Sequence, residues 1–347
     1  VVGLHFAGVY GVENSAVGVD TLKALFAHRT LVTVSAPSAE RVAGGGEGRG
    51  DGKRPAAHFV LRDGFDTKFL GEGDLETPWP GLSDDLAADL ARPSDSTEFR
   101  PHELRYTHFG VMFSQALRLP LMTAVNIDGQ ATRRIKRTAD KWWYDERIPT
   151  DVQYGSKAYD DRLIDRGHMV RREDPNWGDL AEQANEDTFH YTNSAPQHSK
   201  LNQGKAMWLG LESYILDSAR TEGFRVNVFT GPVCGPKDPV LVEEGMTVPL
   251  EFWKVAVMKA AGGGLHATAY LLSQGDMIRR LMEDRGARES VEGFVLGPYR
   301  TFQIRIADLQ TATGHGFGRL ADFDAFAKAD EAARVFRAIE RAEDLIL

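Results

Sequence analysis

The feature that most constrains the fold is a set of four apolar runs of strand length. They are residues 119–127, 225–230, 252–257 and 266–272. Short apolar runs of this kind, rich in β-branched and aromatic residues and bounded by turn signals such as Asp128-Gly129, predict buried strands. No regular alternation of strands and helices accompanies them, and no dinucleotide-binding glycine fingerprint is present. We therefore expect an α+β fold built on a mostly antiparallel sheet flanked by helices.

The chain divides into three predicted parts. In residues 1–29, an apolar strand-like run and a helix-like segment resemble the last strands and closing helix of a trypsin-like peptidase domain, and an unrelated strand and helix is the alternative. No nucleophile turn of the Gly-Asp-Ser-Gly type occurs, so no protease activity is expected. Residues 30–58 include the glycine-rich stretch 44–52, which predicts a flexible linker. Residues 59–347 then form the main domain.

Two segments of the main domain lie outside the four runs. Residues 59–102 contain Pro78, Pro80, Pro93 and Pro101, and this mixed pattern predicts an extended wrap over a neighbouring surface. Residues 321–347 place apolar side chains such as Phe326 and Phe336 at helical spacing, which predicts a closing helical segment.

Composition excludes several classes of protein. The net charge of -9 argues against a uniformly basic coat for nucleic acid, although a local positive groove is compatible with it. The single cysteine, Cys234, excludes an intramolecular disulfide and a cysteine-rich zinc cluster. No run of about 18 apolar residues and no signal region is present, so we expect no membrane association, with the cytoplasm as the default compartment.

Residues 160–212 contain the groups that phosphodiester hydrolysis requires. The reaction needs a base to activate water, a cation to neutralise developing charge and positive side chains to hold phosphate. His168 follows a glycine at the end of a predicted strand, and Asn193 lies on a turn. Glu212 follows Asn202 by nearly three helical turns, which can bring both onto one side of a helix.

Four motifs carry a family resemblance. They are Asp165-Arg166-Gly167-His168, then Thr192-Asn193-Ser194-Ala195-Pro196-Gln197, then Leu201-Asn202-Gln203-Gly204, and finally Trp208 with Leu211-Glu212. In this order they resemble the DNA/RNA non-specific endonuclease family of the ββα-metal, or His-Me finger, superfamily. The similarity covers a catalytic core of about residues 119–317. It implies a ββα-metal nuclease fold within the main domain.

The resemblance also implies roles for individual residues. His168 is expected to be the general base, which suits an imidazole near its reference pKa of about 6.5. Asn202 is expected to be the protein ligand of one Mg²⁺, for which Mn²⁺ can substitute, and Glu212 to hold metal-bound water. Asn193 is expected to orient the site and Arg166 to bind phosphate. The Asn202 to Glu212 spacing is two residues longer than the commonest family spacing, which leaves the role of Glu212 open.

Basic residues around these motifs predict a phosphate-binding groove. Arg137 is our choice for the family's second arginine, with Arg133, Arg134, Lys136 and Lys141 as competitors. The residues expected to contact the phosphate backbone of DNA and RNA without reading sequence are Arg133, Arg134, Arg171 and Arg172. The alternative is that part of this set pairs with acidic neighbours on the surface. Trp177 can stack on a base or belong to the core.

The predicted function is a magnesium-dependent endonuclease that hydrolyses DNA and RNA without regard to sequence or sugar. Two alternatives stay open: a metal-dependent phosphodiesterase acting on another phosphodiester, and a catalytically silent nucleic-acid-binding module. The chain begins at Val1 without an initiator methionine, which favours release from a protease-nuclease precursor as a defence effector. A homodimer, an upstream protease domain and an inhibitor are further expected partners.

Overall fold

The computed structural model describes the main domain and leaves out residues 1–50 and several internal segments. The described residues are 51–137, 140–159, 163–199, 207–235, 238–241, 245–275, 300–328 and 336–339. The predicted peptidase-like part, residues 1–29, therefore lies outside the described residues. Among the described residues, no helix is long and apolar enough to cross a bilayer.

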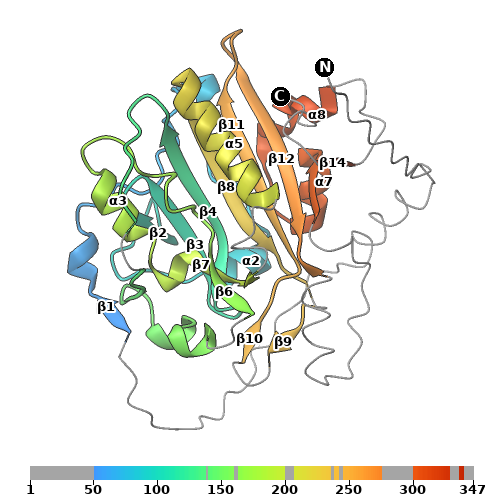
Figure 1. Ribbon diagram of the computed structural model, residues 1–347. Coiled ribbons are helices and arrows are strands. Elements are labelled where there is room, and N and C mark those ends of the chain that lie inside the picture. Colours follow the sequence, from blue (N-terminus) through green and yellow to red (C-terminus); the bar gives the residue numbers. More distant parts are fainter. Residues whose placement is uncertain are drawn as a thin grey trace, which may run out of the picture.

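An eight-stranded antiparallel sheet forms the centre of the molecule (Figure 1). From one edge to the other it contains β14 (Phe336–Ile339), β13 (Arg300–Ile304), β12 (Leu265–Ser273), β11 (Glu251–Lys259), β8 (Arg225–Val233), β4 (Leu119–Asp128), β3 (Phe109–Ser114) and β2 (Glu103–Tyr106). The four apolar runs are β4, β8, β11 and β12, so their prediction as buried strands is confirmed. The α+β class with a mostly antiparallel sheet is confirmed as well.

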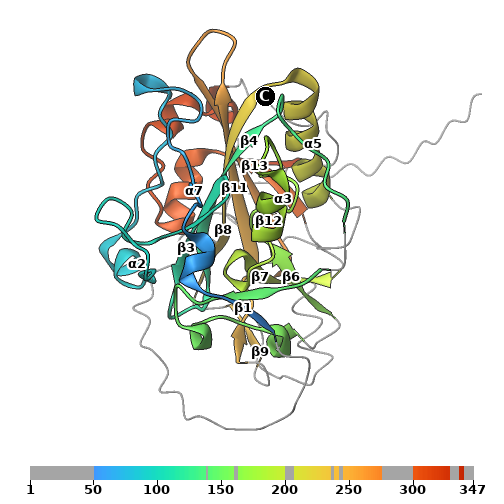
Figure 2. The same ribbon diagram turned by 90° about the vertical axis from the view of Figure 1, so that its left-hand side faces the viewer.

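Alternating side chains of the strands divide the core between the two faces of the sheet. In β11, Phe252 and Ala256 belong to one apolar cluster, whereas Trp253 belongs to another. Helix α5 (Met207–Glu222) covers the first face, and α7 (Ile306–Thr313) covers the opposite face (Figures 1 and 2). Burial of apolar side chains on both faces explains why the four runs are almost continuously hydrophobic.

The turn after β4 depends on the chemistry of Asp128 and Gly129. The Asp128 carboxylate accepts hydrogen bonds from the backbone N–H groups of Gln130 and Ala131, both at 3.1 Å. A Cβ on Gly129 would lie 1.9 Å from the carbonyl oxygen of Ala219 in α5. The Asp-Gly pair therefore ends the strand and lets α5 pack closely against it.

A small unit beside the sheet has the ββα order. Strands β6 (Ile164–His168) and β7 (Ser194–His198) pair antiparallel, and α5 follows them in the chain. Helix α3 (Ala181–Asp187) and the 3-10 turn η5 (Tyr191–Asn193) lie between β6 and β7. The ββα-metal fold is confirmed by this arrangement.

The remaining elements are short. Two further pairs are β1 (Gly52–Arg54) with β5 (Trp143–Asp145), and β9 (Val240–Leu241) with β10 (Met246–Thr247). The described residues also contain the helices α2 (Asp84–Ala88) and α8 (Ala325–Lys328), and the 3-10 turns η1 (Ala56–Phe59), η2 (Gly73–Leu75), η3 (Thr150–Val152), η4 (Ser156–Tyr159) and η6 (Gly318–Phe323).

Three predicted boundaries differ from the structure. The linker was expected to reach residue 58, but β1 pairs with β5 and Phe59 is fully buried, so folded chain begins upstream. The catalytic core was expected to start near Leu119, yet β2 and β3 already belong to the sheet. The closing helical segment is wrong at residues 336–339, which form β14 against β13. Hydrogen bonding to an open sheet edge there outweighs the local helical spacing.

Candidate active site

The β6–β7 hairpin presents the Asp165-Arg166-Gly167-His168 motif. Gly167 pairs with Ala195, and His168 pairs with Ser194. A Cβ on Gly167 would lie 2.1 Å from the side-chain carbonyl carbon of Gln197. A side chain at this position would displace the Gln197 side chain, so glycine allows this close cross-strand packing immediately before His168.

His168 lies in an aromatic pocket that withdraws its ring from water. The ring centroid is 4.8 Å from that of Trp142 and 5.0 Å from that of Phe189. Its Nε2 atom is buried and has no hydrogen-bond partner among the described residues. A buried polar atom without a partner is uncommon and typical of a site that receives a ligand or water.

The charges around His168 favour its neutral form. Burial is the largest cause and lowers the pKa of His168 to about 4. Asp140 raises this pKa, whereas Arg137, Arg172 and Arg166 lower it further. The imidazole is therefore neutral near pH 7, and the same three arginines surround it with positive charge. A neutral ring beside cationic side chains can take a proton from water while an anionic phosphate is bound nearby.

Asn193 joins the end of η5 to the chain that follows His168. It is fully buried, and its side-chain oxygen accepts a hydrogen bond from the backbone N–H of Val170 at 2.9 Å. Its side-chain nitrogen donates to the carbonyl oxygens of Val170 at 3.1 Å and Thr188 at 3.0 Å. The orienting role of Asn193 stays a prediction, and the contacts that its side chain makes are to backbone groups.

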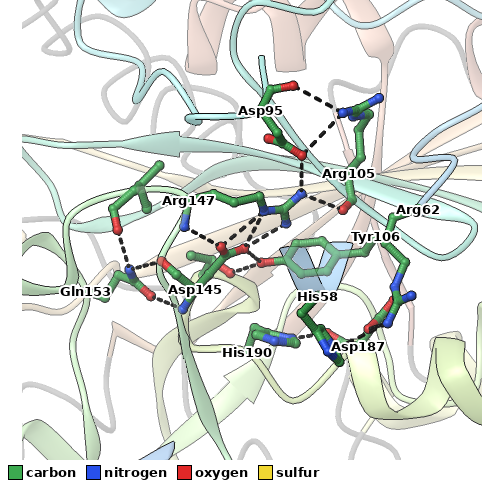
Figure 3. A network of polar contacts seen from close by, with 12 residues as sticks. His58, Arg62, Asp95, Arg105, Tyr106, Asp145, Arg147, Gln153, Asp187 and His190 are labelled. Carbon is green, nitrogen blue, oxygen red and sulfur yellow. Dashed lines mark hydrogen bonds and ion pairs between the residues drawn. The ribbon is translucent and has the colours of Figure 1, made fainter. Parts of the chain in front are cut away.

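A buried polar network that includes Tyr106, Asp145 and Arg147 (Figure 3) contacts η5 through Thr192. The Tyr106 hydroxyl donates to Asp145 at 2.6 Å and accepts from the Thr192 hydroxyl at 2.5 Å. Asp145 also forms a fully buried ion pair with Arg147, at 2.7 Å. Thr192 directly precedes Asn193, so this network holds the turn that orients the site.

The predicted phosphate-binding arginines fall into two groups. Arg133, Arg134 and Arg137 are exposed, and the first and last pair with Asp179 at 3.3 Å and Asp140 at 2.6 Å. Such exposed pairs are weak and can exchange for a phosphate.

The second group is tied into the fold. Arg172 bonds to Glu173 at 2.7 Å and to the side-chain oxygen of Asn185 at 2.8 Å. Arg171 lies 3.8 Å from the Glu173 carboxylate and donates to the backbone carbonyl of Glu212 at 3.3 Å. Arg171 and Arg172 are therefore better described by the alternative, in which a basic residue pairs with an acidic neighbour, than by a role as free phosphate-binding groups.

Glu212 has a partner that the sequence analysis missed. Its carboxylate lies 3.2 Å from the Lys254 ammonium, and the two side chains are only 10% and 2% exposed. Lys254 also donates to the Thr230 hydroxyl at 2.9 Å. The signal was a single lysine inside the otherwise apolar run 252–257, because a charge in a buried strand requires a partner.

Asp174 lies in the same electrostatic environment. The pKa of Asp174 is raised to about 7, mainly by burial and also by the charge of Glu212, against the opposing charges of Arg171, Lys254 and Arg220. The loop after β6, helix α5 and strand β11 thus meet in a buried set of charged groups. This set keeps the α5 segment around Glu212 close to the loop that follows His168.

Several nearby residues are structural. His190 is buried and bonds through Nδ1 to the carbonyl oxygen of Asp187 at 2.8 Å. Trp177 stacks on His108 with ring centroids 3.4 Å apart and donates to the carbonyl oxygen of Asn126 at 2.8 Å. Of its two expected roles, Trp177 therefore belongs to the core.

The donor set bears on the predicted metal. Asn202, the expected ligand, lies outside the described residues. The described residues contain no group of three or more histidine, cysteine, aspartate or glutamate side chains that could hold a metal ion. The Lys254 pairing weakens the expected role of Glu212 toward metal-bound water.

Comparison with known families agrees with this geometry. The sequence model of the DNA/RNA non-specific endonuclease family matches residues 86–323. The chain belongs to this family. The match covers both strands of the β6–β7 hairpin together with α5, and it begins upstream of Leu119, in agreement with the early start of the sheet.

Individual proteins are also similar to this chain. An uncharacterized protein y4fB from Sinorhizobium fredii is 34% identical over 275 residues, which cover 75% of this chain and 39% of that protein. Mitochondrial endonuclease G from Bos taurus is 34% identical over 119 residues, 31% of this chain and 38% of that protein. The human protein is 33% identical over the same length. The chain thus spans less than two fifths of the curated relatives it matches.

A solved structure is similar as well. It is a complex of EndoG with EndoGI, described as showing the mechanism of EndoG inhibition. The TM-score is 0.47 at 19% identity, over 62% of this chain and 84% of that one.

Proposed function

We propose that this chain is a metal-dependent endonuclease that hydrolyses phosphodiester bonds of DNA and RNA without regard to sequence or sugar. The observation that carries the proposal is the environment of His168. Its Nε2 atom is buried and has no hydrogen-bond partner among the described residues, and the positive charges of three arginines help to keep its imidazole neutral. Membership in the DNA/RNA non-specific endonuclease family supports it.

In the proposed reaction, a water molecule attacks the phosphorus and its proton moves to Nε2 of His168. The bond from phosphorus to one sugar oxygen breaks, and this oxygen leaves and takes a proton from solvent. The aromatic pocket excludes other water from the ring, and Asn193 holds the following backbone so that the ring keeps its orientation. Arg166 binds the phosphate oxygens as negative charge accumulates on them. Arg137, Arg133 and Arg134 attract the phosphate backbone on either side of the scissile bond.

Asn202 is the residue proposed to hold Mg²⁺, with Mn²⁺ as a substitute. When bound, the cation supplies positive charge at the phosphate and a fixed shell of water. Glu212 would order that water with one carboxylate oxygen while its carboxylate keeps the ion pair with Lys254.

The test is cleavage by the full chain. Supercoiled plasmid and single-stranded RNA are incubated with purified protein in Mg²⁺ or Mn²⁺, with and without excess EDTA. We expect both substrates to be degraded with either metal, and EDTA to abolish cleavage without lowering the melting temperature. Intact plasmid and RNA in the presence of both metals would overturn the proposal.

Salt dependence separates nucleic acid from a smaller phosphodiester. Binding of a labelled oligonucleotide in EDTA should weaken steeply as salt rises, because each phosphate contact releases condensed counterions. Binding that is independent of salt would instead favour a small phosphodiester as substrate.

The biological setting stays a prediction. A homodimer, an inhibitor, an upstream protease domain and release from a precursor as a defence effector are proposals that no described contact tests, and so is the cellular compartment.

A further inference from the structure

Two cationic side chains from different segments lie over the same indole ring. The guanidinium carbon of Arg54, in β1, is 3.8 Å from the centroid of the Trp143 ring. The ammonium nitrogen of Lys141, two residues before Trp143, is 4.1 Å from the same centroid. The face of an indole attracts a cation, so the ring holds both groups in place. We call these three side chains the cation–indole unit.

The backbone joins this unit to the pocket of His168. Trp143 directly follows Trp142, whose ring centroid is 4.8 Å from that of His168. The backbone N–H of Trp143 donates to the carbonyl oxygen of Phe189 at 3.0 Å, and the Phe189 ring is 5.0 Å from the ring of His168. The unit therefore lies one residue beyond the two aromatic residues that enclose the proposed base.

Strand β1 brings Arg54 to the indole. It pairs with β5 so that Gly52 lies opposite Trp143. A Cβ on Gly52 would lie 2.1 Å from a ring carbon of Trp143, so glycine lets the backbone of β1 lie against the ring. The Asp51 carboxylate also accepts a hydrogen bond from the Tyr191 hydroxyl at 2.9 Å. The position of β1 thus has several supports besides the side chain of Arg54.

The two cations of the unit have no acidic partner in the part of the chain that the structure describes. No carboxylate there lies at ion-pair distance from Arg54 or Lys141, whereas Arg133 and Arg137 each pair with an aspartate. The Nε atom of Arg54 is buried and makes no hydrogen bond. This is unexpected in a chain with 50 acidic and 41 basic residues. Two like charges beside one ring repel each other, and an anion bound next to them would offset that repulsion.

The surroundings of the unit favour a polyanion over a small anion. Lys141 is the last of a series of exposed basic side chains in one segment, namely Arg133, Arg134, Lys136, Arg137 and Lys141. Guanidinium and ammonium groups both bind phosphate. A nucleic acid strand presents phosphates at regular intervals, so one strand can contact several members of such a series at once.

We propose that the cation–indole unit is a second phosphate-binding site, which holds the backbone of a bound nucleic acid outside the scissile bond. The proposal rests on the nuclease function proposed above and adds a reason for a polymeric substrate, because only a polymer reaches both His168 and the unit. Arg54 lies upstream of residues 86–323, which the family model matches. Strand β1 thus extends the nucleic acid surface beyond the matched region.

Arg54→Gln and Lys141→Gln are the test variants. Each removes one positive charge, keeps a polar side chain and leaves the indole of Trp143 in place. The matched control is Lys259→Gln, which also removes one exposed positive charge. Lys259 ends β11, and Figures 1 and 2 show the β11–β12 hairpin at the opposite end of the molecule from β1.

The measurement is equilibrium binding of labelled duplex oligonucleotides to the full chain in EDTA, at several salt concentrations and at a temperature where every variant is folded. We expect each test variant to bind a long duplex about 2- to 5-fold more weakly at fixed salt, the size of an exposed ion pair. The slope of log affinity against log salt should decrease by about 0.9 for each lost phosphate contact. Lys259→Gln should keep the wild-type slope.

Length dependence distinguishes a second site from a contact at the scissile bond. The gain in affinity from a short to a long duplex should be smaller in Arg54→Gln and Lys141→Gln than in Lys259→Gln, because only the long duplex reaches the unit. Equal gains in all three variants, or a wild-type salt slope in both test variants, would overturn the second site.

The two proposals fail in different ways. If the wild-type chain cleaves plasmid and RNA while the test variants bind like Lys259→Gln, the nuclease function stands and the second site is wrong. If the wild-type chain binds the long duplex through Arg54 and Lys141 but cleaves nothing with Mg²⁺ or Mn²⁺, the nuclease function is wrong and the second site stands. Absence of any binding by the wild-type chain would overturn both.

Discussion

The side chain of Asn193 bonds to both backbone polar groups of Val170, accepting from its N–H at 2.9 Å and donating to its carbonyl at 3.1 Å. In the other direction, the N–H of Met169 donates to the backbone carbonyl of Asn193 at 2.9 Å. These contacts clamp the two residues that follow His168. The orientation of the proposed base thus depends on a residue 25 positions further along the chain, counting from 168 to 193.

Replacement of Asn193 by Ala should lower both stability and activity. Two buried backbone groups of Val170 would lose their partners, which costs about 1 to 3 kcal/mol for each group left unsatisfied. Urea denaturation measures the loss, and plasmid cleavage under conditions where the variant is folded measures the effect on His168. Wild-type cleavage by the folded variant would show that the ring does not need this clamp.

His168→Ala should remove the proposed base. We expect the cleavage rate to fall about 10²- to 10⁴-fold, the usual contribution of a positioned general base. His266→Ala, a partly buried histidine on β12, is the control and should cleave at the wild-type rate. Near wild-type turnover of His168→Ala would remove His168 from the mechanism.

The pH dependence follows from the lowered pKa of His168, about 4. The ring is neutral above this value, so kcat/KM limited by the base should stay level from pH 8 to about 5 and fall as pH decreases through about 4. A free imidazole would instead lose activity near its model-peptide pKa of about 6.5. An NMR titration of the His168 ring checks the assignment, and an acid limb at pH 6.5 that follows this ring would contradict it.

The lowered pKa of His168 also makes the folded protein less stable as pH decreases. Because the folded pKa lies below the unfolded value of about 6.5, the unfolded chain binds more protons between pH 6.5 and 4. The contribution of His168 to the free energy of unfolding is therefore complete above pH 6.5 and decreases as pH falls through this window. His168→Gln should flatten that part of the stability curve.

Gly167→Ala should disrupt the β6–β7 hairpin. Its Cβ would lie 2.1 Å from the side-chain carbonyl carbon of Gln197, so this buried side chain must move, and we expect a loss of about 1 to 3 kcal/mol in the free energy of unfolding. Gly262→Ala is the matched control, because a Cβ there meets no atom within 4 Å. Equal melting temperatures for the two variants would show that the hairpin tolerates a side chain at Gly167.

Because Lys254 and Glu212 form a buried ion pair, we expect the effects of their substitutions on the free energy of unfolding to be non-additive. Lys254→Met leaves the Glu212 carboxylate buried without its partner, and removal of one member of such a pair costs about 3 to 5 kcal/mol. Lys254→Met with Glu212→Gln should recover a large part of this loss, since no uncompensated charge stays buried. Additive losses in urea denaturation would mean that the two side chains act independently.

The local sequence pattern was sufficient to predict the central strands and the family of this protein. The apolar runs at 119–127 and 252–257 contain enough hydrophobic surface to require burial wherever they pack, so the sequence alone determined that they are strands. It likewise determined the family, because the Asp165-Arg166-Gly167-His168 motif and the motifs after it occur in a fixed order. The Asp128-Gly129 pair was also recognisable as a turn, because the Asp128 carboxylate bonds to the backbone N–H groups of the next residues.

Only the tertiary structure decided which distant groups meet. The pairing of Lys254 with Glu212, the clamp of Asn193 on Val170 and the contact of Asp51 with Tyr191 join residues that are far apart in the chain. It also decided that residues 336–339 form an edge strand and that residues 52–54 fold against β5. Helical spacing and glycine content are local properties of the sequence. A free sheet edge or a buried unpaired charge exists only once the chain has packed. The residues that pair with such an edge or charge can come from any part of the sequence.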